Sequence, residues 1–256
     1  MINITTGKRE AWAQLVRQWV VWESSLAGSV LPILRRQWRD TIRDVSQGIY
    51  SVGPTVTNQR AALREVLLTH YRRLSEHFHR QTQDAIQATQ ERGLAQKDAD
   101  GIYDMEMEPW MRAHSQTQTD RINKTTISIL AGLVALRVQE NASAAEIAAE
   151  LTAVEEMSNR ARAATIARTE THTAYAKSVH ESVRASGVPM EEKEWLSALD
   201  ERTRMEHIVA NGERVPMNEP FMATGEPLDY PGDPGGSLWN IINCRCVALY
   251  HTRRGV

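Results

Sequence analysis

Cysteine, proline and glycine gather near the C-terminal end of this 256-residue chain. Both cysteines, Cys244 and Cys246, flank a single residue, and five of the nine prolines lie within residues 216–234. Five glycines lie in nearly the same stretch, within residues 212–236. A segment of this composition cannot bond its own backbone in a helix or a sheet ladder, so other side chains must do so. We therefore expect one fixed site here and a helical scaffold upstream.

Upstream, apolar residues recur at the spacing of helices. The periodicity predicts one helix over residues 8–26 and a second over residues 31–45, with a turn between them at Gly28 and Pro32. Residues 48–58 contain a further glycine and proline and are expected to form a loop.

A long proline-free helix is predicted to follow that loop. The polar residues 81–118 then predict a hinge or an exposed helical connection, because Gly93, Gly101 and Pro109 divide the stretch into short pieces. Residues 125–141 are apolar on several sides and predict a well-buried helix.

Helix signals continue into the second half of the chain. Ser143 and Glu146 have the spacing of a capping box, and the short helix that they open is expected to end near Leu151. A separate, longer helix is predicted over residues 159–185, with Gly187 just beyond its end.

Short strands and turns are predicted for the remaining residues. The expected elements are a strand at 194–199, a helical turn at 200–207 capped by Asp200, a hairpin at 209–216 and a last strand at 241–250. The predicted class is α+β, with a mainly helical N-terminal region followed by a small mixed α/β C-terminal domain that contains a long Pro/Gly-rich loop. We place the domains at residues 1–140 and 141–256.

The N-terminal region is basic and rich in tryptophan. Residues 1–80 contain twelve lysines and arginines against six acidic residues, and four of the seven tryptophans lie in the first forty positions. These tryptophans either fill a core or, together with nearby arginines, form a surface that binds another protein, since both residue types are enriched at interface hot spots. The candidate partner-binding residues are Trp12, Trp19, Trp22, Trp38, Arg35, Arg36 and Arg39.

No apolar run approaches the roughly 18 residues that a membrane-spanning helix requires, and the N-terminus lacks the pattern of a secretory signal. We therefore expect a protein made in a cytoplasm that does not contact a membrane. Two cysteines on either side of one residue are also poorly placed for a disulfide, because the bridge requires Cβ atoms roughly 3.8 Å apart.

A series of uncommon residues occurs in a fixed order in the second half of the chain. The series consists of Ala-Arg-Thr-Glu-Thr at 167–171, Gly187, Trp195, Asp200, Arg204, His207, Phe221, Pro231 and Asn-Cys-Arg-Cys at 243–246. In this order the residues resemble the phage Mu F-like head morphogenesis family, over roughly residues 140–251.

The resemblance implies a structural role. Members of that family are minor head (capsid) proteins of tailed double-stranded DNA phages, associated with the portal vertex, and they act in head assembly with suspected roles in DNA packaging or ejection. It implies a stand-alone minor head protein, located in the virion head and in the host cytoplasm during assembly. The implied partners are the portal protein, a major capsid or scaffolding protein, and packaged double-stranded DNA bound without sequence preference.

Three interpretations of the C-terminal residues stay open. Cys244, Cys246, His207 and His251 form the one plausible zinc-ligand set in the sequence, although their spacing is not that of a common zinc finger. In the second interpretation both thiols are small buried groups, and polar neighbours bond the loop. This structural set comprises Arg168, Glu170, Trp195, Asp200, Arg204, His207, Asn243, Cys244, Arg245 and Cys246. We favour the second interpretation and expect neither metal nor cofactor.

Catalysis is the third interpretation. Cys244 would be a nucleophile and His207 its base, with Asn243 or Asp200 as the orienting group, as in a cysteine enzyme or toxin domain. Alternatively, Arg168 and Glu170 would serve an ADP-ribosyl transfer. Neither motif is complete, since no glycine-rich elbow or helix N-terminus follows Cys244, and we expect no enzyme activity. The remaining alternative to a head protein is a metal-stabilised nucleic-acid-binding module.

Overall fold

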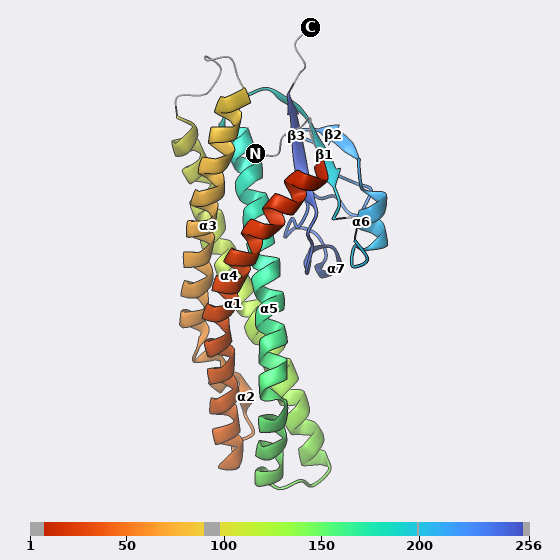
Figure 1. Cartoon of the computed structure of the whole chain (residues 1–256). Coiled ribbons are helices and arrows are strands. Elements are labelled where there is room, and N and C mark those ends of the chain that lie inside the picture. Colours follow the sequence, from red (N-terminus) through yellow and green to blue (C-terminus); the bar gives the residue numbers. More distant parts are fainter. Residues whose placement is uncertain (1–7, 90–97, 199, 253–256) are drawn as a thin grey trace. The chain divides into compact units, whose positions relative to one another are not determined.

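The structure is a computed structural model that describes residues 8–89, 98–198 and 200–252 (Figure 1). The long helices are α1 (Lys8–Ser46), α3 (Arg60–Thr89), α4 (Ala99–Gln139) and α5 (Ala144–Ala185). The shorter elements are α2 (Val52–Thr57), β1 (Met190–Leu196), α6 (Met205–Val209), β2 (Arg214–Pro216), α7 (Leu238–Ile241) and β3 (Val247–Thr252). A mostly helical N-terminal region with a small sheet near the C-terminus confirms the predicted α+β class.

The first helix is continuous where the sequence predicted two helices. α1 passes through Gly28 and Pro32, so the expected turn between them was wrong. Leu26, Val30 and Leu34 recur every four residues and are at most 1% exposed. Burial of this apolar face outweighs the single backbone hydrogen bond that proline cannot donate, and the helix therefore continues.

The hinge expected within residues 81–118 was wrong for the part of that stretch that the structure describes. α4 runs without a break through Gly101 and Pro109. Its polar composition misled the prediction, because Ser115 and Thr119 are fully buried rather than solvated. The hydroxyl of Ser115 bonds within the helix, because its Oγ donates to the carbonyl of Arg112 at 2.9 Å.

Three further expectations concern the segments on either side of α3. Residues 48–58 contain the short helix α2, with Val52 and Val56 buried, so this stretch is not simply a loop. The long helix predicted after it is α3. Gly93, which was expected to divide the next stretch, lies outside the described residues.

The capping box that opens α5 is confirmed. Ser143 N donates to Glu146 Oε2 at 2.7 Å, and Glu146 N donates to Ser143 Oγ at 3.3 Å. The predicted break after Leu151 was wrong, because α5 continues to Ala185. Gly187 follows with a φ of 69°, a left-handed conformation typical of the residue beyond a helix end.

The chain divides into two compact units. Unit 1 comprises the described residues of Met1–Glu23, Tyr71–Pro109 and Arg168–Val256, and unit 2 comprises Ser24–His70 and Trp110–Ala167. Each long helix therefore contributes residues to both units. The boundary that we placed after residue 140 stays a prediction. Among the described residues, none of the helices combines the length and apolar character that a bilayer crossing requires.

Unit 2 has a core formed by the helices alone. Trp38 is 1% exposed and packs among Val45, Leu130 and Leu151. Its Nε1 donates a hydrogen bond to the carbonyl of Leu151 at 2.9 Å, so the polar end of the ring is also satisfied.

Unit 1 contains a three-stranded antiparallel sheet with the order β2-β1-β3. The central strand begins at Met190 and brings Trp195, which is fully buried, opposite Ala248 on β3. β2 pairs with β1, so the hairpin expected within residues 209–216 was wrong. β3 starts only at Val247, and both cysteines therefore precede the last strand rather than lie on it.

Candidate functional site

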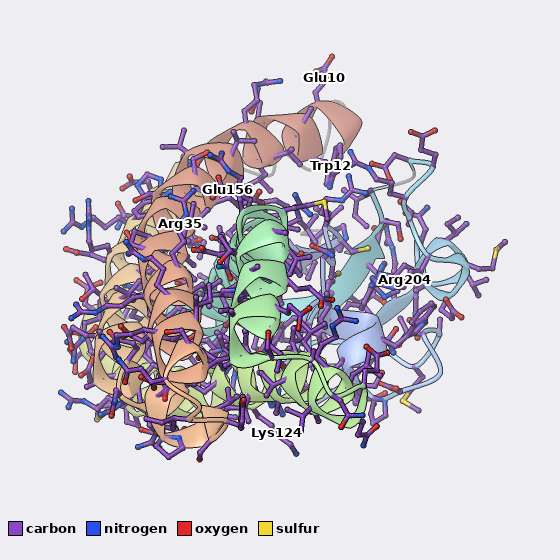
Figure 2. The ribbon with its side chains drawn as sticks, turned by 90° about the horizontal axis from the view of Figure 1, so that it is seen from below. Glu10, Trp12, Arg35, Lys124, Glu156 and Arg204 are labelled. Atoms are coloured by element: carbon purple, nitrogen blue, oxygen red, sulfur yellow. The ribbon has the colours of Figure 1, made fainter. Side chains whose placement is uncertain are left out.

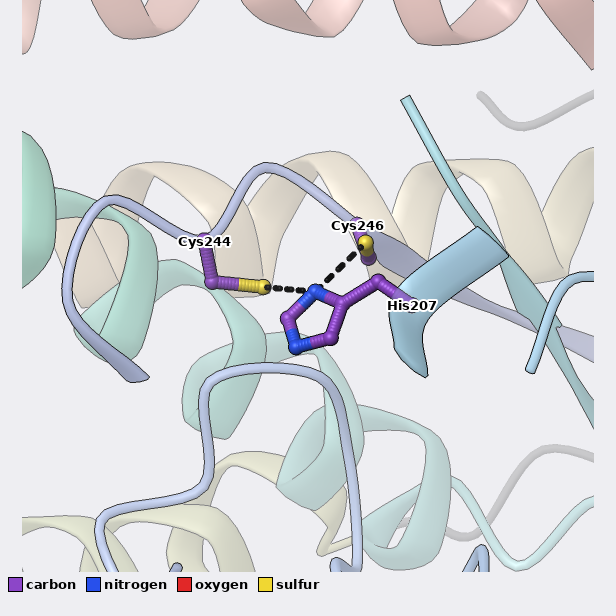
Figure 3. A group of neighbouring side chains, drawn as sticks. All are labelled: His207, Cys244 and Cys246. Carbon is purple, nitrogen blue, oxygen red and sulfur yellow. Dashed lines mark hydrogen bonds between the residues drawn. The ribbon is translucent and has the colours of Figure 1, made fainter. Parts of the chain in front are cut away.

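The two cysteines and one histidine meet in the interior of unit 1. His207 Nδ1 lies 3.8 Å from Cys244 Sγ and 3.4 Å from Cys246 Sγ (Figure 3). The three possible ligand atoms all lie within 4.8 Å of one another. The side chains are buried, with 1% exposure for each cysteine and 2% for the histidine. We call these three residues the Cys-His cluster.

The histidine ring is held from several sides. His207 Nε2 lies 3.2 Å from Asn240 Oδ1 on α7, an acceptor that fixes the proton on Nε2. Trp195 packs edge-on against the ring, with centroids 5.5 Å apart and planes at 77°. The Trp195 indole donates to Ser197 Oγ at 3.1 Å, and that hydroxyl donates to the carbonyl of His207. With Nε2 protonated, Nδ1 presents its lone pair to the two sulfurs.

Arginines and one helix anchor the loop that carries the cysteines. Arg204 Nη2 donates to the carbonyl of Ile242 at 2.6 Å. Arg168 Nη1, on α5, donates to Asn243 Oδ1 at 2.9 Å, and Asn243 N donates to Thr169 Oγ1 at 3.1 Å. The loop backbone that no sheet ladder bonds is thus satisfied by side chains from α5 and from the residue before α6.

Two aromatic side chains complete the anchoring. His172 Nε2 donates to the carbonyl of Cys246 at 2.7 Å, and Trp12 Nε1 on α1 donates to the carbonyl of Arg245 at 2.8 Å. Burial lowers the pKa of His172, which therefore stays neutral in the interior. Segments far apart in the sequence thus converge on one short loop.

Asp200 and Arg245 form a paired contact beside the cluster. Arg245 Nη2 lies 2.7 Å from Asp200 Oδ1, and Nη1 contacts Oδ2. The hydrogen bond from Arg245 lowers the pKa of Asp200 to about 2. Asp200 Oδ1 also accepts from Arg202 N at 3.1 Å and from Thr203 Oγ1 at 3.0 Å, so it closes the turn before α6. The helix itself begins at Met205 with Arg204 as its N-cap, so the expected helical turn over residues 200–207 capped by Asp200 was wrong.

The two thiols have unequal acidity. Burial raises the pKa of Cys244 well above its ordinary value. Hydrogen bonds with Cys244, with His207 and with the backbone of Ala198 lower the pKa of Cys246 well below its ordinary value. Cys246 is therefore the sulfur that the surroundings favour as a thiolate.

The remaining candidate residues contact groups outside the Cys-His cluster. His251 Nε2 lies 3.0 Å from Glu194 Oε2, and His251 is not in the group of atoms within 4.8 Å. Glu170 Oε2 accepts from Tyr71 OH at 2.6 Å, whereas Arg168 bonds the cysteine loop, so these two do not form a common site.

Sequence reasoning missed Asn240 and His172. Asn240 occupies the orienting position for which Asn243 and Asp200 had been considered, and no sequence signal marks it. His172 lies four residues after Arg168 on α5, which places both on one helix face. That spacing was the signal available for His172.

The N-terminal candidates separate into buried and exposed residues. Trp19 and Trp38 are each 1% exposed, so they fill cores and offer no surface to a partner, while Trp12 and Trp22 are half-buried. Arg35 pairs with Glu156 at 2.5 Å (Figure 2). The exposed members of the set are Arg36 and Arg39.

Residues 132–249 match the family model described as phage Mu protein F like protein. The match covers the Cys-His cluster and the loop anchors on α5 and at Arg204, whereas the N-terminal part of the chain, including Trp12, lies outside it. Comparison with curated proteins and with solved structures found no similar chain.

Proposed function

Because residues 132–249 match the model of the phage Mu protein F-like family, a family of structural phage head proteins, we propose that this protein is a minor head protein of a tailed double-stranded DNA phage. In this proposal it sits at the portal vertex, acts in head assembly and assists packaging or ejection of DNA. The family match is the observation that carries the proposal.

The interior of unit 1 supports a structural role over a catalytic one. A nucleophile must reach a substrate, yet Cys244, Cys246 and His207 are at most 2% exposed. The anchoring bonds to the loop also come from residues that are spread over the chain, which suits a part that must keep its shape within an assembly. We accordingly propose that the protein is not an enzyme.

Attachment to the portal protein is proposed for the exposed basic face of α1. Arg36 and Arg39 are exposed, whereas Trp38 between them faces the core. Deleting this helix would remove core residues, so the test uses surface substitutions in the full chain. Arg36→Glu combined with Arg39→Glu should weaken co-purification with the portal protein of the same phage at least tenfold.

A matched control pair exists on α4. Arg121 and Lys124 are also exposed cations three residues apart, and they lie in the same unit. Arg121→Glu combined with Lys124→Glu makes the same change of charge and should leave portal binding unchanged. Equal loss with both pairs would show a general charge effect and contradict the assignment to α1.

The C-terminal end offers the competing surface. Met205, Val209, Leu238 and Trp239 are between 56% and 70% exposed, and the Arg204 guanidinium lies 5.2 Å from the centroid of the Trp239 ring. Leu238→Ser combined with Trp239→Ser tests it in the same assay. If this variant loses the portal protein while the α1 variant keeps it, the interface lies on α6 and α7 instead.

A further inference from the structure

We infer that His207, Cys244 and Cys246 bind a zinc ion. Sequence reasoning favoured a site without metal because burial alone could explain the two thiols, no fourth ligand was compelling, and the spacing was not that of a common zinc finger. The structure replaces that set by three buried residues whose ligand atoms lie within 4.8 Å of one another. This inference rests on the geometry of the cluster and is independent of the proposed role in the phage head.

The distances in the cluster suit tetrahedral zinc. Zinc binds thiolate sulfur at about 2.3 Å and imidazole nitrogen at about 2.0 to 2.1 Å, so tetrahedral geometry places sulfur and nitrogen ligands roughly 3.6 Å apart. The observed separations from His207 Nδ1 are 3.4 Å to Cys246 and 3.8 Å to Cys244, on either side of that value. One nitrogen lone pair cannot accept a good hydrogen bond from two thiols, whereas one ion between the three atoms satisfies all of them.

The outer contact of the histidine points to the same conclusion. A zinc-bound imidazole ordinarily donates its other N–H to an oxygen acceptor, which fixes the ring orientation. Asn240 Oδ1, 3.2 Å from His207 Nε2, is such an acceptor (Figure 3 shows the ring with Nδ1 directed between the sulfurs). Asn240 is 2% exposed, so a buried protein group and not a water molecule fixes the orientation of the His207 ring.

The charge balance also suits a dication. Binding would release one proton from each thiol, so two thiolates would neutralise Zn²⁺ with a neutral imidazole as the third ligand. Soft thiolate ligands select zinc over hard cations such as Mg²⁺ and Ca²⁺. The described residues supply three ligands, and a water molecule would complete the tetrahedron, as in other zinc sites with three protein ligands. The ion would join α6 to the loop before β3.

Elemental analysis of the full-length protein tests this inference. The protein is purified without chelator from cells grown with added zinc, beside Cys244→Ser, Cys246→Ser and the control His251→Gln. Wild type and the control should each contain about one zinc per chain, while each cysteine variant should lose most of it. Wild-type zinc no higher than that of the cysteine variants would overturn the inference, as would stoichiometric copper or iron in its place.

A second measurement covers cysteine variants that fail to fold. Cobalt(II) added to the chelator-treated wild-type protein should give the intense thiolate-to-metal absorption of a site with sulfur ligands, and zinc should displace it. Chelator should also lower the melting temperature of the wild type, and added zinc should restore it. A melting temperature unchanged by chelator, with no thiolate absorption from cobalt, would overturn the inference without any variant.

Discussion

Asn243 has a φ of 57°, in the left-handed region that asparagine tolerates better than most residues. Its amide oxygen accepts from Arg168, and its backbone N–H donates to Thr169 Oγ1. Asn243→Ala removes the amide and places at this positive φ a residue that tolerates the left-handed region less well than asparagine, so the free energy of unfolding should fall by about 1 to 3 kcal/mol. Asn243→Gly removes the amide but accepts the same φ, and it should lose less.

Urea unfolding of Asn243→Ala and Asn243→Gly measures the difference between their free energies of unfolding. His207→Ala should lower the free energy of unfolding by at least as much as Asn243→Ala, because it leaves Asn240 and both sulfurs without their shared partner. Wild-type stability in both alanine variants would mean that the loop is not held by these side chains.

The ion pair between Asp200 and Arg245 makes stability depend on pH. Arg245 lowers the pKa of Asp200 from 3.8 to about 2 in the folded chain. A lowered carboxyl pKa contributes stability that is present above pH 4 and is lost as the pH falls toward 2. Asp200→Asn should therefore flatten the loss of stability between about pH 4 and pH 2. Denaturant titrations at several pH values measure the free energy of unfolding of both proteins. Parallel plots of this free energy against pH would contradict the assignment of the pH dependence to Asp200.

At the scale of whole elements, two substitutions test whether α1 is continuous through residues 28–32. Pro32 and Gly28 are exposed positions inside a helix, and no atom lies within 4 Å of a Cβ built on Gly28. Gly28→Ala should raise stability by up to about 1 kcal/mol, and Pro32→Ala by up to about 3 kcal/mol. Thermal melts check both changes. If residues 28–32 formed the turn that the sequence predicted, both substitutions would lower the melting temperature.

The elements divide into those that local chemistry predicts and those that packing decides. Ser143 with Glu146, and Gly187, are local signals that mark a helix start and a helix end as predicted, although a single helix, α5, joins them. Pro32 and Pro109 are local signals that packing overrides, because the buried faces of α1 and α4 outweigh one missing hydrogen bond each. A short stretch of sequence does not show how much apolar surface is buried, since that depends on residues contributed by other helices.

The candidate site shows the same division. His207, Cys244 and Cys246 were identified from the order of rare residues, and the structure brings them together. Asn240 and Trp12 were not assigned to the site, because their contacts join segments up to 233 positions apart. Local sequence patterns carry no information about such contacts.

Over the whole molecule, the basic surplus of the first 80 residues is partly neutralised by later acidic residues. Arg35 pairs with Glu156, Arg60 with Asp120 and Arg72 with Glu108, at 2.5, 2.7 and 2.5 Å. Exposed pairs of this kind add little stability, but they reduce the positive field that a polyanion meets. Any contact with packaged DNA must therefore depend on the remaining exposed cations, which include Arg36 and Arg39.

We expect such a DNA contact to be independent of base sequence and steeply dependent on salt. Each phosphate contact contributes about −0.9 to the slope of log affinity against log salt. Arg36→Glu with Arg39→Glu should reduce the size of that slope by about 2, whereas Arg121→Glu with Lys124→Glu should leave it nearly unchanged. Fluorescence anisotropy with two unrelated duplexes of equal length measures it. Tighter binding to one of the two duplexes, or an affinity that does not change with salt concentration, would contradict binding of packaged DNA through its phosphate charges.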